Sequence, residues 1–246
     1  MDITFLSVLG AGLLSCLLCT LGILSIYNFK EWAKNSMNYF MYFAAGILLS
    51  VAFLIAAPKA FEMNPHGPMY LLAGFLGIFL VDRFIDVYVC HEDENERNLR
   101  IGIVAGLGIA VHSFVDGVIY ATTYSVSFFL GVASTLGMIF HEYPEGIVTF
   151  SLFMKGGLGT KKSFIYAFLV AAATTPIGAI VSYPFISQLT GPHLGLMLGI
   201  SAGVLAYVGA AHLLPEAERE SKKYGILSFA LGVIIAILLW TVKTQL

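Results

Sequence analysis

The sequence predicts an all-α integral membrane protein with eight transmembrane helices. Hydrophobic residues make up 58% of the 246 residues and charged residues only 11%, whereas a typical soluble domain has about 25% charged residues. The mean hydropathy is +0.86. Eight apolar segments are long enough to cross a bilayer as helices, which requires about 20 residues each. The formal net charge of -2 predicts no basic surface of the kind that binds nucleic acid.

These eight segments set the order of the elements along the chain. We place them, as spans 1 to 8, at residues 3–27, 38–61, 68–90, 101–123, 128–154, 164–186, 193–214 and 225–242. The loops between them are short, so we expect one transmembrane domain over residues 1–246 with no soluble domain attached. Any function should therefore reside within the membrane.

The basic residues predict how the spans are oriented. Ten of the 13 Lys and Arg residues follow spans 1, 3, 5 or 7. Because Lys and Arg accumulate in cytoplasmic loops, we expect these loops to face the cytoplasm and both termini to lie outside. The ten are Lys30, Lys34, Arg97, Arg100, Lys155, Lys161, Lys162, Arg219, Lys222 and Lys223.

Spans 4 and 5 each carry a histidine and a carboxylate near mid-membrane. The segment HSFVDG holds His112 and Asp116, and the segment HEYPEG holds His141 and Glu145. Each pair is four residues apart, so both side chains project from one helical face. An ionisable group in the hydrocarbon region costs about 2.5–3.5 kcal/mol, and packing alone explains two such pairs at one depth poorly. If the helices face each other, the four ligands suit zinc or another divalent transition metal.

Residues next to these ligands extend the prediction. Ser113 and Glu142 each follow a predicted histidine ligand and point about 100° further round the helix, where they can line a second, adjoining position. Pro144 has no N–H group, so the carbonyl of Phe140 loses its helical partner and a kink is expected beside His141. Similar breaks are expected at Pro58, Pro176 and Pro215.

A third polar group lies in the cytoplasmic halves of spans 3 and 7. Asp82 and Arg83 are expected to form an internal charge pair, because opposite charges in lipid tend to associate. The other members are either transient metal ligands between the central site and the inner face or ordinary solvated helix ends. They are Asp86, His91, His212 and Glu216.

The ends of spans 2 and 7 are similar in sequence. FLIAAPKAFE and GAAHLLPEAE both end an apolar run with a proline, a charged residue, an alanine and a glutamate. Span 2 runs outward and span 7 inward, and similar segments in opposite orientation indicate inverted repeats. We therefore predict a 3+2+3 arrangement, with repeats at residues 1–91 and 161–246 around a central helix pair at 101–154.

The two central motifs resemble those of the Zrt/Irt-like (ZIP) family of metal transporters. HSFVDG is similar to that family's His-Asn-Phe-x-Asp/Glu-Gly motif, and HEYPEG to its His-Glu-x-Pro-His/Glu motif. The eight spans, exterior termini and 3+2+3 arrangement extend the resemblance over the whole chain. It implies a transporter, not an enzyme, that carries zinc, iron, manganese or a related ion such as cadmium into the cytoplasm. The carrier would alternate between outward- and inward-facing states.

Carried over residue by residue, the resemblance implies a main metal site at His112, Asp116, His141 and Glu145. Ser113 and Glu142 would form a second position. Two departures weaken that position: Ser113 stands where the family usually has Asn, and Thr175 stands where some bacterial members have Glu.

The resemblance also concerns the two ends of the ion's path. It implies ligands along a cytoplasmic exit path at Asp86, His91, His212 and Glu216. Lys59 replaces a Glu often found at this point, which would reduce the attraction for metals at the outer entrance. The short loop HEDENERN lacks the His-rich run of many eukaryotic members, which favours a compact prokaryotic protein in the cytoplasmic (inner) membrane.

Two other functions fit part of the sequence. HEYPE begins like the H-E-x-x-H motif of zinc proteases, but Glu145 replaces the second histidine, Pro144 interrupts the helix, and HSFVDG stays unexplained. A channel of the same architecture would share the site. Metal ions and the bilayer are the expected partners, and a homodimer is left open.

Overall fold

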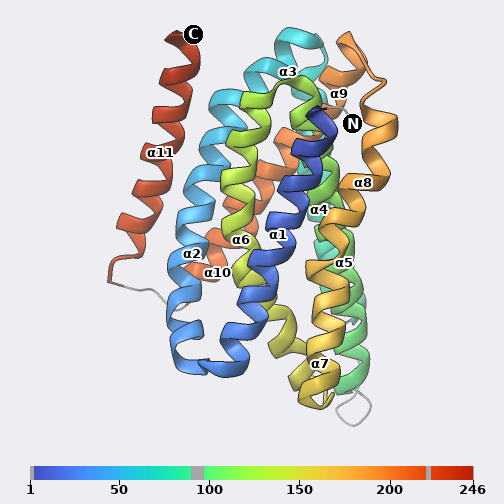
Figure 1. Ribbon diagram of the computed structural model, residues 1–246, viewed down its shortest axis with the longest axis vertical. Helices are drawn as coiled ribbons and strands as arrows, with labels where there is room; N and C mark the ends of the chain where they lie inside the picture. The colour runs from blue at the N-terminus through green and yellow to red at the C-terminus, as the bar shows by residue number, and fades with distance from the viewer. Residues whose placement is uncertain (1–2, 90–96, 220–222, 246) are drawn as a thin grey trace.

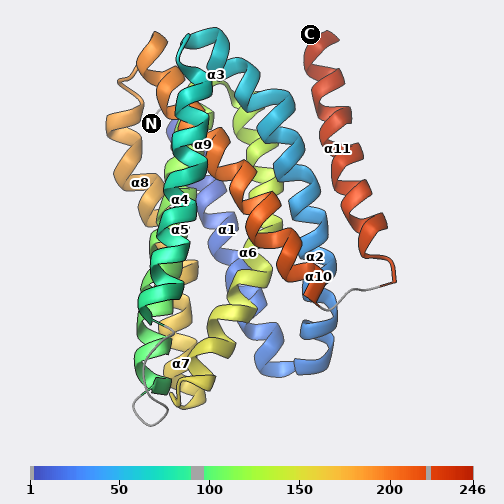
Figure 2. The same ribbon diagram turned by 180° about the vertical axis from the view of Figure 1, so that it is seen from behind.

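The computed structural model describes residues 3–89, 97–219 and 223–245, and the side chains of residues 3–84, 106–219 and 223–242. Within these ranges the regular structure is helical and contains no strand, which confirms the all-α prediction. The helices pack side by side along one common direction (Figures 1 and 2). They are α1 (Ile3–Asn28), α2 (Lys30–Val51), α3 (Ala57–Met63), α4 (Gly67–Val89), α5 (Arg97–Val126), α6 (Phe128–Lys155), α7 (Thr160–Ala167), α8 (Thr174–Ile186), α9 (Gly191–Tyr207), α10 (Leu214–Arg219) and α11 (Gly225–Gln245).

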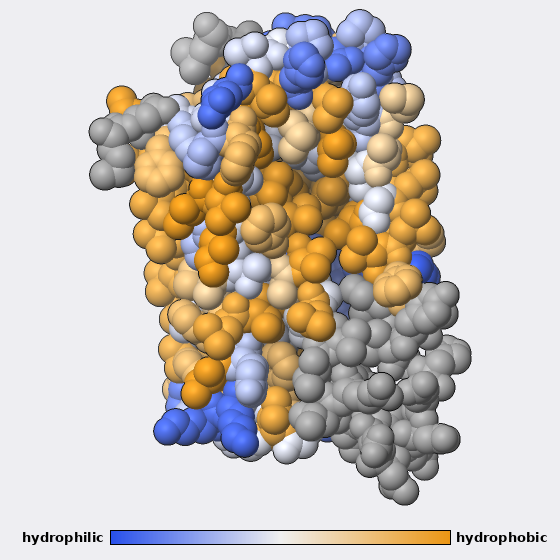
Figure 3. All heavy atoms as spheres, turned by 90° about the vertical axis from the view of Figure 1, so that its right-hand side faces the viewer, coloured by the Kyte–Doolittle hydropathy of each residue, from blue (hydrophilic) through white to orange (hydrophobic). Residues whose placement is uncertain are grey.

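The helices form a multi-pass membrane protein. Six helical segments are long and apolar enough to cross a bilayer. Figure 3 shows an apolar band between two hydrophilic ends. The first turn of α1 and the last turn of α11 lie at the same end of the bundle (Figure 1). The six segments are Ile3–Asn28, Lys30–Met63, Gly67–Phe84, Thr160–Ile186, Gly191–Arg219 and Gly225–Val242.

Three of these long helices contain a π-helical turn where the sequence predicted a break. The turns are η1 (Ala52–Ala56), η2 (Phe168–Ala172) and η3 (Val208–Leu213). Each lies shortly before a proline, at Pro58, Pro176 or Pro215. A proline removes one backbone donor, and a π turn shifts the hydrogen bonds by one residue so that the helix continues. The amide of Leu214, for example, donates to the carbonyl of Gly209. The expected breaks are therefore bulges within continuous helices.

Pairs of glycines let four pairs of helices approach closely. In each pair, a glycine of one helix faces a backbone carbonyl of the other helix, and the partner helix returns the contact. A methyl group at any of these positions would overlap that carbonyl, so only glycine permits the spacing. The pairs are Gly22 with Gly146 between α1 and α6, Gly117 with Gly178 between α5 and α8, Gly46 with Gly232 between α2 and α11, and Gly74 with Gly203 between α4 and α9.

These contacts divide the bundle into two groups of helices. One group contains α1, α5, α6 and α8, with α5 packed against both α6 and α8 and with α1 also against both. In the other, α2 packs against α11, and α4 against α9. The two groups meet mainly where α2 lies along α6, with smaller contacts of α1 with α2 and of α5 with both α4 and α9. The helix pair that carries both polar motifs, α5 and α6, is thus enclosed by helices on several sides.

Candidate metal site

The polar motifs of α5 and α6 meet in the interior of the bundle. His112 and Asp116 come from α5, and His141 and Glu145 come from α6. Each residue offers one ligand atom, and these four atoms all lie within 4.8 Å of one another. The four-residue spacing places each histidine and its carboxylate on the same helical face, and the packing of α5 against α6 turns these two faces toward each other. The structure therefore brings together the four residues that the sequence predicted as the main site.

The distances among these atoms match one small cation. Nε2 of His141 lies 3.1 Å from Oδ2 of Asp116 and 3.7 Å from Oε2 of Glu145. Nε2 of His112 lies 3.5 Å from the same Asp116 oxygen and 3.9 Å from the same Glu145 oxygen. Ligands bound tetrahedrally at zinc distances are about 3.3–3.6 Å apart. The four side chains are thus already close to the geometry of a tetrahedral metal site.

The cluster is buried but not sealed. The side chains of Asp116 and His141 are 2% and 3% exposed, whereas those of Glu145 and His112 are 10% and 14% exposed. Nδ1 of His141 has no hydrogen-bond partner among the described residues. Burial in a medium of low dielectric strengthens the attraction between carboxylates and a cation, and the cluster is accessible along its edge at His112 and Glu145.

Two hydroxyl groups distinguish Glu145 from Glu142. Ser113 donates a hydrogen bond to Oε1 of Glu145 at 2.5 Å, which leaves Oε2 of that residue facing the two imidazoles. Thr175 of α8 donates to Oε1 of Glu142 at 3.1 Å. Oε2 of Glu142 is buried without a partner among the described residues, and Glu142 is not part of the four-residue cluster. Ser113 therefore acts here as a hydrogen-bond donor to a predicted ligand.

In the third polar group, His212 lies next to His112, and Asp82 lies next to His212. The rings of His112 and His212 are 5.8 Å apart, and Nδ1 of His212 lies 3.8 Å from Oδ2 of Asp82. His212 is 54% exposed, so it borders open space. Glu216 forms an ion pair with Arg219 at 2.9 Å. Two more predicted residues fall outside the described part of the chain: Asp86, through its side chain, and His91 altogether.

Other residues that the sequence singled out have local partners. Lys59 forms an ion pair with Glu62 at 2.8 Å, and Arg83 lies over the ring of Phe79.

One buried interaction near the site gave no signal in the sequence. The hydroxyls of Ser15 on α1 and Tyr120 on α5 lie 2.6 Å apart in the interior. A serine in an apolar run is expected to bond within its own helix, so the sequence could not indicate a partner 105 residues away. The bond joins α1 to α5 within the helix group that carries the site.

The helical bundle and its buried histidine–carboxylate cluster define a class of protein: a multi-pass membrane protein able to hold a metal ion in its interior. Comparison with known proteins agrees. The family model described as "ZIP Zinc transporter" matches residues 91–239, and the chain belongs to this family. The family is one of transporters, so the protease interpretation of HEYPE is set aside.

Curated relatives match over nearly the whole chain. "Zinc transporter ZupT" of Chlorobium chlorochromatii (strain CaD3) is 28% identical over 94% of this chain and 92% of its own length. "Zinc transporter ZupT" of Clostridium perfringens (strain 13 / Type A) is 26% identical over 97% and 94%. The "Uncharacterized protein MJ1036" of Methanocaldococcus jannaschii is 25% identical over 87% and 92%.

Proposed function

We propose that the protein carries divalent transition metal ions, with zinc as the main cargo, through the membrane into the cytoplasm by way of the α5–α6 cluster. The observation that carries this proposal is the convergence of His112, Asp116, His141 and Glu145 within 4.8 Å in the interior of a membrane protein. The relatives named as zinc transporters support zinc as the cargo, and iron, manganese and cadmium fit the same ligands.

Charge balance favours a divalent cargo in this site. Two neutral imidazoles and two ionised carboxylates give the empty ligand set a charge of about -2, so binding one divalent cation leaves a neutral unit. A neutral unit costs far less to hold in a medium of low dielectric than a net charge does. Protons compete with the metal for all four ligands, so we expect uptake to decrease in acid.

We further propose that this site holds one strongly bound ion. Ser113 and Glu142 would supply the second position, but Ser113 is engaged with Glu145 and Thr175 occupies one oxygen of Glu142. Only Oε2 of Glu142 is left free among these atoms. One free oxygen supports a weak auxiliary position at most, because stable metal sites in proteins use several ligands.

The exit to the cytoplasm is proposed to pass His212 and Asp82. Exposure rises from His141, at 3%, through His112, at 14%, to His212, at 54%. Each step is short enough for an ion to exchange one ligand for the next. Glu216, three residues past the π turn η3, and the predicted residues Asp86 and His91 would continue this path toward the inner face.

The proposed topology has eight transmembrane helices, with α5 and α6 added to the six apolar segments and both termini outside. The equivalent glycine pairs in α2–α11 and α4–α9 support inverted repeats, as do η1 and η3, which each lie two residues before a proline. Transport would follow from the two helix groups rocking against each other. The topology is tested by labelling Lys34→Cys and Lys59→Cys, in a chain without its natural cysteines, with a membrane-impermeant thiol reagent. Only Lys59→Cys should react from outside in intact cells.

Transport is tested in proteoliposomes loaded with a zinc-sensitive dye. Uptake of Zn, Cd, Fe and Mn is compared for wild type, His141→Ala, Glu145→Ala and the control His193→Ala, which changes an exposed histidine far from the cluster. The two site variants should lose about 100-fold or more in initial rate at low metal, and His193→Ala should retain it. Site variants that transport like wild type would show that the cluster is not on the path. Flux that rises linearly without saturation would favour a channel.

A further inference from the structure

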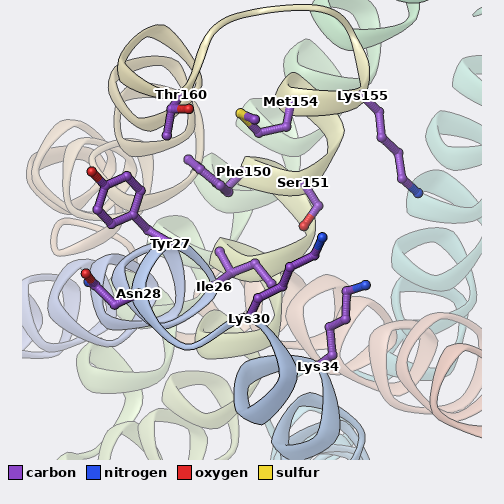
Figure 4. A pocket seen from close by; sticks show the side chains of 10 residues that line it. All are labelled: Ile26, Tyr27, Asn28, Lys30, Lys34, Phe150, Ser151, Met154, Lys155 and Thr160. Atoms are coloured by element: carbon purple, nitrogen blue, oxygen red, sulfur yellow. The ribbon is translucent and has the colours of Figure 1, made fainter.

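A second polar region lies at the end of the bundle where α1 ends and α7 begins. A cavity of about 680 Å³ opens there between four helices. Three lysines line it: Lys30 and Lys34 from the start of α2, and Lys155 from the end of α6. Figure 4 shows their ammonium groups extending to the same side of the cavity. The midplane cluster described above plays no part in this cavity.

The three lysines leave a concentrated positive charge in the cavity. Among the described residues, no aspartate or glutamate lines it. Within the described part of the chain, the salt bridges that occur involve other residues, so none of the three ammonium groups is neutralised by a carboxylate. Three like charges around one cavity repel one another, and an anion placed between them relieves that repulsion while gaining three charge-assisted hydrogen bonds. The polar side of the cavity therefore favours a multivalent anion such as a phosphate.

Three apolar side chains also line the cavity. Ile26, Phe150 and Met154 line it, and the ring of Tyr27 packs edge-on against Phe150 at 6.5 Å. The amide of Asn28 and the hydroxyl of Ser151 donate to carbonyls of their own helices. These groups therefore add little to anion binding, and the lysines supply the attraction. A cavity lined by both cations and hydrocarbon groups matches a molecule with an anionic head and an apolar tail.

We propose that this cavity binds the phosphate headgroup of an anionic phospholipid, with the start of an acyl chain against Ile26, Phe150 and Met154. The cavity lies at the membrane end of α1 and α6, where headgroups meet hydrocarbon. Basic pockets between transmembrane helices on the cytoplasmic side bind anionic headgroups in this manner. Because Lys30 and Lys34 belong to α2 and Lys155 belongs to α6, one headgroup would bridge the two groups of helices.

The test is retention of lipid by the purified full-length protein. The protein is reconstituted in phosphatidylcholine vesicles containing a fluorescent phosphatidylglycerol and its neutral analogue, and binding is measured by energy transfer from protein tryptophan. The triple variant Lys30→Gln, Lys34→Gln, Lys155→Gln replaces the three charges with neutral polar side chains that are one atom shorter. A matched double variant, Lys161→Gln with Lys162→Gln, removes neighbouring charges that do not line the cavity. Thermal unfolding of each variant confirms that it is folded.

Wild type should bind the anionic lipid in preference to the neutral one, and the triple variant should bind it on the order of 100-fold more weakly, because each basic residue contributes about one tenfold step or somewhat less. The double variant should change binding much less. Inorganic phosphate should displace little of the lipid, since it lacks the apolar part. Equal weakening in both variants would reduce the effect to general surface charge and overturn the proposal. Full displacement by inorganic phosphate alone would overturn the assignment to a lipid.

Discussion

The π turns η1 and η3 share a backbone design but differ in their side chains. Each lies two residues before a proline, at Pro58 or Pro215. Each also packs against the helix that contains the other, η1 on α9 and η3 on α2. The exposed side chains of η1 are the hydrocarbon groups of Phe53 and Leu54. η3 instead exposes His212, whose ring lies 5.8 Å from that of His112.

The residues after the two prolines widen this difference. Lys59 follows the first proline and is paired with Glu62, whereas Glu216 follows the second and is paired with Arg219. The comparison teaches that two π turns with the same placement before a proline can expose different chemistry, hydrocarbon groups in η1 and an imidazole in η3.

The largest expected effect is a loss of stability when a glycine at a close helix contact is replaced in either half of the bundle. Gly46→Ala and Gly203→Ala should each destabilise the protein by about 1–3 kcal/mol, because the added methyl group overlaps a carbonyl of the facing helix. If the two halves are equivalent, the two variants should lower the melting temperature in detergent by similar amounts.

Gly10→Ala and Gly77→Ala are the controls for that measurement. A methyl group at either position meets no atom within 4 Å, and alanine favours a helix over glycine by about 1 kcal/mol. These variants should melt at the wild-type temperature or slightly above it. Melting temperatures that fall as far as those of Gly46→Ala would contradict the close-approach explanation.

The next largest effect is expected on zinc binding at the α5–α6 cluster. Ser113→Ala removes the hydrogen bond to Oε1 of Glu145 and should weaken zinc binding about tenfold or more, because donors behind metal ligands hold them in place. Thr175→Val removes the corresponding bond to Glu142 and should change zinc binding less than about threefold. Calorimetric titration with zinc in detergent measures both, and equal losses would argue for a full second metal position.

A smaller effect, on the rate of zinc uptake, is expected at His212, the exposed histidine of η3. His212→Ala removes the first side chain beyond His112 and should lower the rate of zinc uptake about fivefold with little change in zinc affinity, since it acts after binding. The control is again His193→Ala. Uptake in proteoliposomes and calorimetric titration give the two numbers, and a loss of affinity matching the loss of rate would place His212 in the main site instead.

The smallest effect is expected at the outer cation. Lys59→Gln should raise the initial rate of uptake about twofold at low salt, because it removes a positive charge near the entrance. This gain should disappear at high salt, where exposed charges are screened. Lys223→Gln is the control, because the proposed topology places Lys223 on the opposite, cytoplasmic side of the membrane. It should leave the rate unchanged. A gain that persists at high salt would exclude an electrostatic cause.

Much of the fold could be predicted from hydropathy, because a helix that crosses lipid must satisfy its backbone internally and present an apolar surface. The apolar runs placed the helices to within a few residues in most cases. The helix of span 2 is longer than expected, since it begins at Lys30 and not near residue 38. The prolines were recognised as irregular points, but whether each would break or bulge its helix depended on neighbouring helices that hold the π turns in place.

The residues of the candidate site could also be predicted from the sequence, because their spacing is a property of single helices. The four-residue spacing of His112 with Asp116, and of His141 with Glu145, fixes a shared face within each helix. It does not fix which oxygen of Glu145 faces the imidazoles, and the hydrogen bond from Ser113 decides that. The sequence predicted Ser113 as part of a second position and gave no sign of this hydrogen bond, because the bond depends on how α5 packs against α6.

Local spacing and apolar content, which are properties of one helix at a time, were enough to predict a membrane protein with a histidine–carboxylate pair on each of two central helices. Contacts between distant helices were needed for everything else. They bring His212 and Asp82 together beside His112, turn isolated glycines into reciprocal pairs, and gather Lys30, Lys34 and Lys155 around one cavity. The reason is physical: the period of a helix determines which residues share a face, but only the packing of one helix on another determines what that face meets.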